Sequence, residues 1–498
     1  MKKAALHALI LCILVSVLAF GPSTPAAEGY DPDATVKIGS MTPPVSLNNV
    51  GGAGQGVNEA LYCNVYEPLM VLEDDGAITN GLAASYEISG DGLVYTFKLR
   101  KGVTFHDGSP LMAADVKFSF NRVLTKASKA ARKADLLRVI DKVDVVDDGT
   151  IVVKMKQKSQ SMMYFVTYVW ILKEGAANTE ATANGTGPFK LADYKSGTSI
   201  TLERNAHYWG DAARCKKIII KYFNNNSAQA NALTSGQIDI ITNVDSPEQL
   251  TNFKGKSKFT ITEGKSTVKQ VLAFNDQRKP FTDMRVRQAI SSAINKEAIR
   301  KATWDTYGLL IGSFVPPSDP WYEDLSGINS YNPARAGKLL ADAGLPDGFS
   351  FELITPATEA HQLSAQAVKN DLAKIGVTVS IKVIDPSAWY QIVFKNRDYD
   401  ATLQEHVNDR DLVWYGNPKF YWGYDNKDVQ QWVSDAQLAD TPEQETAIYK
   451  KIARTIAEEA ASSWLYLYPQ LRISASNVTG YPANGKNASF YMGKIRKK

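Results

Sequence analysis

Two kinds of hydrophobic periodicity alternate along most of this chain, and that alternation limits its fold more than any other feature. Residues 94–99 alternate apolar and polar side chains as in a half-buried strand, and residues 113–123 place apolar side chains along one helical face. The same order returns later, where a helix predicted over 359–375 leads into a strand over 377–383. Strands that alternate with helices predict an α/β architecture.

The chain is long enough to form several hydrophobic cores. Its 498 residues correspond to about three domains, because a typical domain has roughly 150 residues. A glycine-rich break at 184–188 interrupts the pattern, and strands are predicted around 200–202 and 217–222 after it. We therefore predict that residues 61–187 form an inserted unit.

Capping residues predict two further helices. Thr282 or Asp283 precedes a run whose apolar side chains share one face. A long amphipathic pattern starts at Thr441 and ends at Ala461. Both helices belong to the second half of the chain, so the α/β pattern continues almost to the C-terminus.

Residues 1–27 have the layout of a secretory signal peptide. Two lysines precede an apolar run over 4–20, and helix breakers and small residues follow it, which predicts cleavage after Ala26 or Ala27. The alternative is a membrane anchor, but the run is at the short limit for crossing a bilayer. Cys12 is not preceded by the small residues that lipid attachment requires. We expect a soluble mature chain outside the cytoplasm.

The charge balance argues against nucleic acid as a partner. Lys and Arg total 56 against 52 Asp and Glu, so there is no basic surplus of the kind that nucleic-acid binding requires.

The mature chain keeps two cysteines, Cys63 and Cys215. One disulfide and two unpaired thiols both remain open, because the sequence does not give the distance between these residues.

No catalytic or cofactor motif is present in the sequence. The patterns GxSxG, HExxH and CxxC are absent, which favours a binding protein without metal or cofactor over an enzyme. Charged and polar residues are dense at 405–411, a segment that contains His406, Asp409 and Asp411. The two aspartates could serve as the acid and base of a secreted hydrolase, and a solvated loop is the other interpretation.

Several motifs in a fixed order resemble the family 5 extracellular solute-binding proteins, which deliver oligopeptides, dipeptides or nickel to ABC importers. The motifs in the first part of the chain are GLAASYE (81–87), DG (91–92), YTFKLR (95–100), VTFHDG (103–108) and ADVKFS (114–119). The later motifs are GTGPF (185–189), Asn205 with Tyr208 and Trp209, GQID (236–239), FN (274–275), PF (280–281), RVRQA (285–289), LL (339–340) and AG (343–344). This ordered set is more specific than any single motif, and it covers nearly the whole mature chain.

The resemblance implies an α/β, two-lobed periplasmic-binding-protein fold of the large three-domain type, with mixed sheets and a hinge between the lobes. One lobe would combine 28–60, 188–270 and 476–498 and would carry the insert 61–187, and the other lobe would span 271–475. Closure would trap a ligand between the lobes, and the membrane permease of an ABC importer would recognise the closed form. We expect a periplasmic monomer.

The resemblance also implies a ligand anchor. In similar peptide binders, an aspartate in the segment that matches 408–415 pairs with the N-terminal ammonium of the peptide. Asp411 is the best match to the position of this aspartate, and Asp409 is the second candidate. A carboxylate in a water-poor cleft holds an ammonium through charge-assisted hydrogen bonds. The nearby aromatic residues would either form the walls of the site or fill the core: Trp414, Tyr415, Tyr421 and Trp422.

Departures from similar dipeptide binders change the expected ligand. Segment 353–358 lacks the arginine that clamps the ligand carboxylate in those proteins, and Glu405 or His406 stands where an aromatic residue is usual. A longer peptide or another small polar solute is therefore expected in place of a dipeptide. The alternative within the family is a chelated metal such as nickel, which His406 would coordinate.

Overall fold

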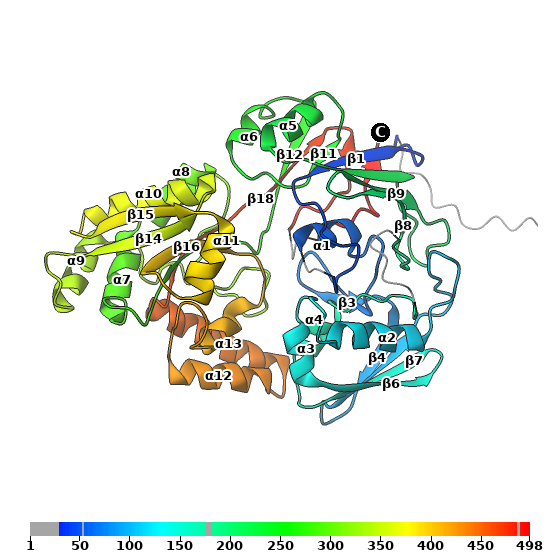
Figure 1. Cartoon of the computed structure of the whole chain (residues 1–498), viewed down its shortest axis with the longest axis horizontal. Coiled ribbons are helices and arrows are strands. Elements are labelled where there is room, and N and C mark those ends of the chain that lie inside the picture. Colours follow the sequence, from blue (N-terminus) through cyan, green and yellow to red (C-terminus); the bar gives the residue numbers. More distant parts are fainter. Residues whose placement is uncertain (1–28, 52–53, 176–181, 486–488) are drawn as a thin grey trace, which may run out of the picture.

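Three large β-sheets, of seven, five and four strands, form the framework of the described part of the chain (Figure 1). The computed structural model describes residues 29–51, 54–175, 182–485 and 489–498. The predicted export segment and its Cys12 lie outside these described residues. No helix in the described part of the chain is both long and apolar enough to cross a membrane.

A seven-stranded mixed sheet is built from the two ends and the middle of the chain. Strand β1 runs parallel to β10 and β11, and the remaining neighbours are antiparallel. In sheet order, the strands are β12 (Phe259–Gly264), β18 (Gln470–Ala475), β11 (Ile240–Ile241), β1 (Thr35–Ser40), β10 (Lys217–Tyr222), β9 (Ser199–Arg204) and β8 (Phe189–Lys195). Helices α1 (Gln55–Leu61), α5 (Asn226–Thr234) and α6 (Glu248–Thr251) and the short pair β19 (Val478–Thr479) and β20 (Arg496–Lys497) complete this seven-stranded unit.

An antiparallel sheet of four strands forms a second unit. Its order is β4 (Ala83–Ile88), β5 (Val94–Leu99), β7 (Thr150–Met155) and β6 (Ile140–Asp147). The hairpin β2 (Met70–Leu72) and β3 (Ile78–Asn80) and the helices α2 (Ala113–Leu124), α3 (Lys133–Val139) and α4 (Met162–Val166) complete this four-stranded unit. Tyr95, Phe97 and Leu99 are buried together with Val116 and Phe120 of α2, which confirms the periodicities predicted for both segments.

The turn at 106–108 fastens the four-stranded unit to the segment before β8. The His106 Nε2 atom lies 3.0 Å from Gly187 O, and the His106 amide donates a hydrogen bond to Gly185 O at 2.8 Å. A side chain at Gly185 would collide with the backbone oxygen of Val65. Burial lowers the pKa of His106 to about 4, so the imidazole is neutral. The turn at 106–108, although it belongs to a recognisable sequence motif, therefore has a structural role.

The third unit is a five-stranded sheet with helices on both faces. Its order is β15 (Thr378–Ile384), β14 (Ser350–Pro356), β16 (Ala401–His406), β13 (Lys269–Phe274) and β17 (Ser463–Leu467). One face is covered by α7 (Met284–Ala293), α8 (Lys296–Trp304), α9 (Pro333–Asp342) and α10 (Glu359–Ala373). The other face is covered by α11 (Pro386–Trp389), α12 (Lys427–Gln437) and α13 (Pro442–Glu458). The predicted helix starts are confirmed, since Asp283 and Thr441 cap α7 and α13 with their side chains.

Two short segments link the seven-stranded and five-stranded sheets. Residues 265–268 lead from β12 to β13, and Tyr468 and Pro469 lead from β17 to β18. The Tyr468 amide donates a hydrogen bond to Val268 O at 2.9 Å, so the two links run side by side. In Figure 1, β18 leads from the five-stranded unit to the seven-stranded unit, and the four-stranded unit lies below the latter.

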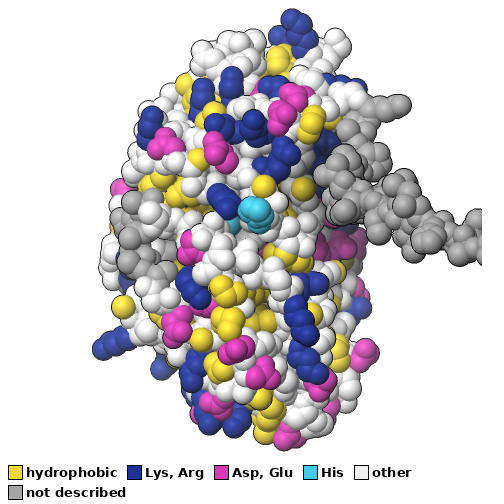
Figure 2. Space-filling view, turned by 90° about the vertical axis from the view of Figure 1, so that its right-hand side faces the viewer, with side chains coloured by type: hydrophobic (Ala, Val, Ile, Leu, Met, Phe, Trp, Pro, Cys, Tyr) yellow, Lys and Arg dark blue, Asp and Glu magenta, His cyan; other side chains and the backbone are white. Residues whose placement is uncertain are grey.

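The surface carries both signs of charge. Figure 2 views the side of the molecule that is on the right in Figure 1, and Lys and Arg side chains are intermixed there with Asp and Glu. This mixture agrees with the near balance of 56 basic and 52 acidic residues in the sequence. Cys63 and Cys215 are both free thiols, and Cys215 is buried.

Candidate ligand-binding site

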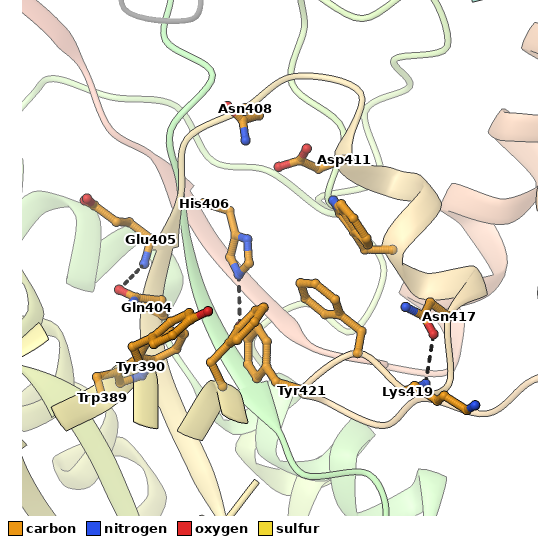
Figure 3. A pocket seen from close by; sticks show the side chains of 13 residues that line it. Trp389, Tyr390, Gln404, Glu405, His406, Asn408, Asp411, Asn417, Lys419 and Tyr421 are labelled. Carbon is orange, nitrogen blue, oxygen red and sulfur yellow. Dashed lines mark hydrogen bonds between the residues drawn. The ribbon is translucent and has the colours of Figure 1, made fainter. Parts of the chain in front are cut away.

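A pocket of about 580 Å³ lies in the five-stranded unit beside the end of β16 (Figure 3). Its walls are mostly aromatic, with polar groups between them. The aromatic lining residues are Trp389, Tyr390, Phe394, Trp414, Phe420 and Tyr421. The other lining residues are Gln404, Glu405, His406, Asn408, Asp411, Asn417 and Lys419. An aromatic cavity with a few polar groups is typical of a site for a small organic ligand.

Strand β16 decides which polar side chains point toward the pocket. In its antiparallel pairing with β13, His406 lies opposite Lys269 and Glu405 lies opposite Gln270. Because neighbouring side chains of a strand point to opposite faces, His406 faces the pocket and Glu405 faces away from it, as Figure 3 shows. Glu405 therefore lines the pocket without aiming its carboxylate into it.

The His406 imidazole is neutral and fixed in position. Its Nε2 atom lies 2.9 Å from the hydroxyl of Tyr421, and the two rings are nearly parallel. Burial, helped by the positive charge of Lys269, lowers the pKa of His406 to about 3. Within the described residues, no group of three or more His, Cys, Asp or Glu side chains is arranged to hold a metal ion.

Asp411 is the acidic residue whose carboxylate reaches the pocket. It begins the 3₁₀ turn Asp411–Gly416 and is only 3% exposed. Burial raises the pKa of Asp411 to about 6, against the opposing effects of Lys269 and Arg132. Its Oδ1 atom is buried and accepts no hydrogen bond from the described residues, and the nearest cation is the Arg132 guanidinium at 3.9 Å.

Asp409 has a different environment and does not line the pocket. Its side chain is completely buried and accepts a hydrogen bond from the hydroxyl of Tyr164 at 2.6 Å. Its backbone oxygen accepts a hydrogen bond from Arg132 at 2.9 Å. Tyr164 and Arg132 belong to the four-stranded unit, so Asp409 lies at the contact between the two units.

The four predicted aromatic residues divide into two pairs. Trp414 and Tyr421 line the pocket, and Trp414 stacks on Phe420 with ring centroids 5.0 Å apart. Tyr415 and Trp422 are fully buried and stack on each other at 4.4 Å in the core behind the pocket. Trp414 is 38% exposed and can contact a ligand, whereas Tyr421 borders the pocket but is only 1% exposed. Tyr415 and Trp422 support the wall from behind.

Several lining residues were not predicted from the sequence. Tyr390 and Phe394 stack at 5.2 Å, because a π-helical turn over Tyr390–Lys395 follows α11. The spacing of four residues between these two rings was a usable signal, since it places them on one helical face. Lys269, which does not line the pocket, is the first residue of β13 and lies opposite His406 of β16, and its local sequence did not indicate this pairing.

Comparisons with known proteins agree with this architecture. The profile of the bacterial extracellular solute-binding proteins, family 5 (middle), matches residues 77–428. The glutathione-binding protein GsiB of Salmonella choleraesuis is 26% identical over 456 residues, covering 86% of this chain and 88% of that protein.

Two solved structures show the same fold. One is the periplasmic binding protein DppA of Helicobacter pylori in complex with the peptide STSA, with a TM-score of 0.75 and 24% identity over 93% of this chain and 98% of that chain. The other is NikA of Brucella suis in complex with Fe(III)-EDTA, with a TM-score of 0.81 and 22% identity over 94% of this chain and 100% of that chain. The fold is therefore the predicted two-lobed one. Since the family profile matches more than half of its length, the chain belongs to the bacterial extracellular solute-binding proteins, family 5.

Proposed function

We propose that this protein captures a peptide between its two lobes, outside the cytoplasm, and delivers it to the permease of an ABC importer. One observation carries the proposal. Asp411 places a buried carboxylate oxygen, which accepts no hydrogen bond from the described residues, at the edge of a pocket with aromatic walls. The relative from Salmonella choleraesuis is named for glutathione, which is itself a tripeptide.

The pocket chemistry suits a peptide with a free amino terminus. The ammonium would meet the Asp411 carboxylate, where the surrounding protein excludes water and strengthens a charge-assisted hydrogen bond. The amides of Asn408 and Gln404 can exchange hydrogen bonds with peptide groups. The rings of Trp414 and Phe420 give an apolar surface that tolerates different peptide side chains.

The two links between the sheets supply a hinge for this capture. We place the lobe boundaries at 265–268 and at Tyr468 and Pro469, because β18 pairs within the seven-stranded sheet. The lobe that carries the pocket then runs from β13 to β17. The other lobe combines the seven-stranded and four-stranded units, and the protein acts as a monomer.

The positions of the two aspartates favour binding over hydrolysis. Glycoside hydrolysis needs two carboxyl groups that face one bond of the substrate. Asp411 lines the pocket, whereas Asp409 is covered by Tyr164 and Arg132. The pair does not face a common cavity, so this protein is proposed to be a binder and not an enzyme.

A chelated metal is the second candidate ligand. The observation that favours it is the neutral imidazole of His406 in the pocket wall, because a metal ligand must be unprotonated. Its Nε2 atom already contacts Tyr421, which leaves Nδ1 for coordination. A single histidine gives a weak site, so the chelator would have to supply most of the remaining ligands.

Native mass spectrometry of gently purified, exported protein tests the peptide proposal. The expected spectrum contains the mature chain with a retained peptide, or with a peptide gained from an added mixture of tripeptides with free amino termini, called the tripeptide mixture below. The matched control is Asp411→Asn, which should lose the adduct. A spectrum in which only a metal chelate is retained would select the second candidate, and turnover of the peptides would contradict a binding role.

A further inference from the structure

A buried group of charged side chains joins the four-stranded and five-stranded units directly beside the pocket. Three carboxylates and three cations meet there: Asp319, Asp409, Asp411, Arg132, Lys269 and Arg410. Arg132 comes from the four-stranded unit, at the start of α3, and the other five residues come from the five-stranded unit. The cluster therefore exists as a whole only when the two units are in contact.

Two arginines reach across this contact in opposite directions. Arg132 donates to the backbone oxygen of Asp409 at 2.9 Å and to the hydroxyl of Tyr164 at 3.2 Å. Arg410 lies over the ring of Tyr164, with its guanidinium carbon 4.1 Å from the ring centroid. Both arginines have left-handed backbone conformations, with φ of 59° and 53°. These conformations are unfavourable for a residue with a side chain and persist where the surrounding structure holds them.

The cross-unit contacts converge on the segment that carries the ligand anchor. Tyr164 donates to Asp409 Oδ1 at 2.6 Å, and the Arg132 guanidinium approaches Asp411 Oδ1 at 3.9 Å. From the other side, the buried Lys269 donates to the backbone oxygen of Asn408. Backbone and side chains of 408–411 are thus held by groups of both units, and Arg132 and Tyr164 reach them only across the interface.

We propose that Arg132 and Tyr164 are positioning residues for Asp411, which engage it when the lobes close and so couple closure to the orientation of the ligand anchor. This inference rests on the proposed function in one respect, namely that Asp411 contacts the ligand. In the open form, 408–411 keeps Lys269 as a partner but lacks the hydrogen bonds from Arg132 and Tyr164. Closure then adds one cation beside Asp411 and fixes the loop that carries it.

Contacts at the rim of the same interface provide a matched control. Lys158 forms an ion pair with Asp440 at 2.5 Å, and both side chains are partly exposed to water. Such exposed ion pairs contribute little, because solvent and salt screen them. If the interface were held by its total number of ion pairs, Lys158→Gln and Arg132→Gln would have similar effects. If it is held by the buried contacts, only Arg132→Gln will matter.

Small-angle X-ray scattering at low ionic strength measures closure without any ligand. We expect a compact wild type, a larger radius of gyration for Arg132→Gln, partial recovery in Arg132→Lys, and no change in Lys158→Gln. Tyr164→Phe keeps the ring under Arg410 and should give a smaller increase. Identical scattering profiles of the wild type and Arg132→Gln would overturn the proposal.

Calorimetric titration with the tripeptide mixture measures the coupling to Asp411. Arg132→Gln should weaken binding about tenfold, the effect of losing one hydrogen bond from a charged group, and Arg132→Lys should regain part of that loss. Unchanged affinity would contradict the positioning role. If wild type binds no peptide but its compaction still depends on Arg132, then the proposed function fails while the cross-lobe contact stands.

Discussion

His406 and Tyr421 stack in the pocket wall with their ring planes 4° apart, and a 2.9 Å hydrogen bond joins the imidazole Nε2 to the tyrosine hydroxyl. The pair sits between the apolar core of the five-stranded unit and the cavity. A neutral imidazole in this position presents one nitrogen to its tyrosine partner and leaves the other to the pocket. His406 is therefore part of the wall and not a charged group that competes with Asp411.

The depressed pKa of His406 makes its contribution to stability depend on pH. The folded protein binds this proton only near pH 3, whereas an unfolded histidine binds it near pH 6.5. Below pH 6.5 the unfolded state takes up more protons, so stability falls as the pH decreases. Relative to His406→Phe, the wild type should lose about 2 kcal/mol of unfolding free energy between pH 7 and pH 5.

Denaturant unfolding of both proteins at the two pH values checks this prediction. A pH-independent difference for His406→Phe would show that the imidazole is solvated and free to take up a proton.

The two tryptophans near the pocket should respond differently to truncation. Trp414 is 38% exposed and stacks on Phe420, so Trp414→Ala should weaken ligand binding by about 1 kcal/mol and cost only about 1 kcal/mol of unfolding free energy, the contribution of one aromatic pair. Trp422 is fully buried against Tyr415, so Trp422→Ala should cost about 3 to 5 kcal/mol of unfolding free energy. Thermal unfolding and calorimetric titration of both variants separate the two effects, and equal destabilisation would refute the division into wall and core.

Export should release a free chain. The small residues up to Ala27 and the missing lipid-attachment pattern before Cys12 predict a mature N-terminus at Ala27 or Glu28. Intact-mass measurement and N-terminal sequencing of exported protein test this prediction. A retained N-terminal segment or a diacylglyceryl group would contradict it.

Periodic segments were predictable because their pattern repeats. The apolar faces predicted from the sequence are buried in the strand over 94–99 and in the helices near 113–123, 359–375 and 441–461. The segment from Asp411 to Trp422 lacks such a period, because it combines a 3₁₀ turn with a loop. Its aromatic residues therefore could not be assigned to wall or core from the sequence.

The sequence pattern also could not predict contacts between segments that are distant along the chain. Arg132 looks like one of several basic residues in 129–138, and nothing local indicates that its guanidinium reaches Asp409 and Asp411. The pairing depends on how the four-stranded and five-stranded units meet, which is a property of the tertiary structure. The resemblance to the family predicted Asp411 as the anchor, but it did not predict Arg132 and Tyr164 as the groups that we propose to position it.

Calorimetric titration of the wild type and Asp411→Asn with the tripeptide mixture tests the central claim most directly. Asp411→Asn should lose about 2 to 5 kcal/mol of binding free energy, as expected when one partner of a buried charge pair is removed. Asp398→Asn, an exposed carboxylate in the same unit, should bind like the wild type, and N-acetylated tripeptides should bind both proteins weakly. Full binding of the free peptides by Asp411→Asn would contradict the assignment of Asp411 as the peptide anchor.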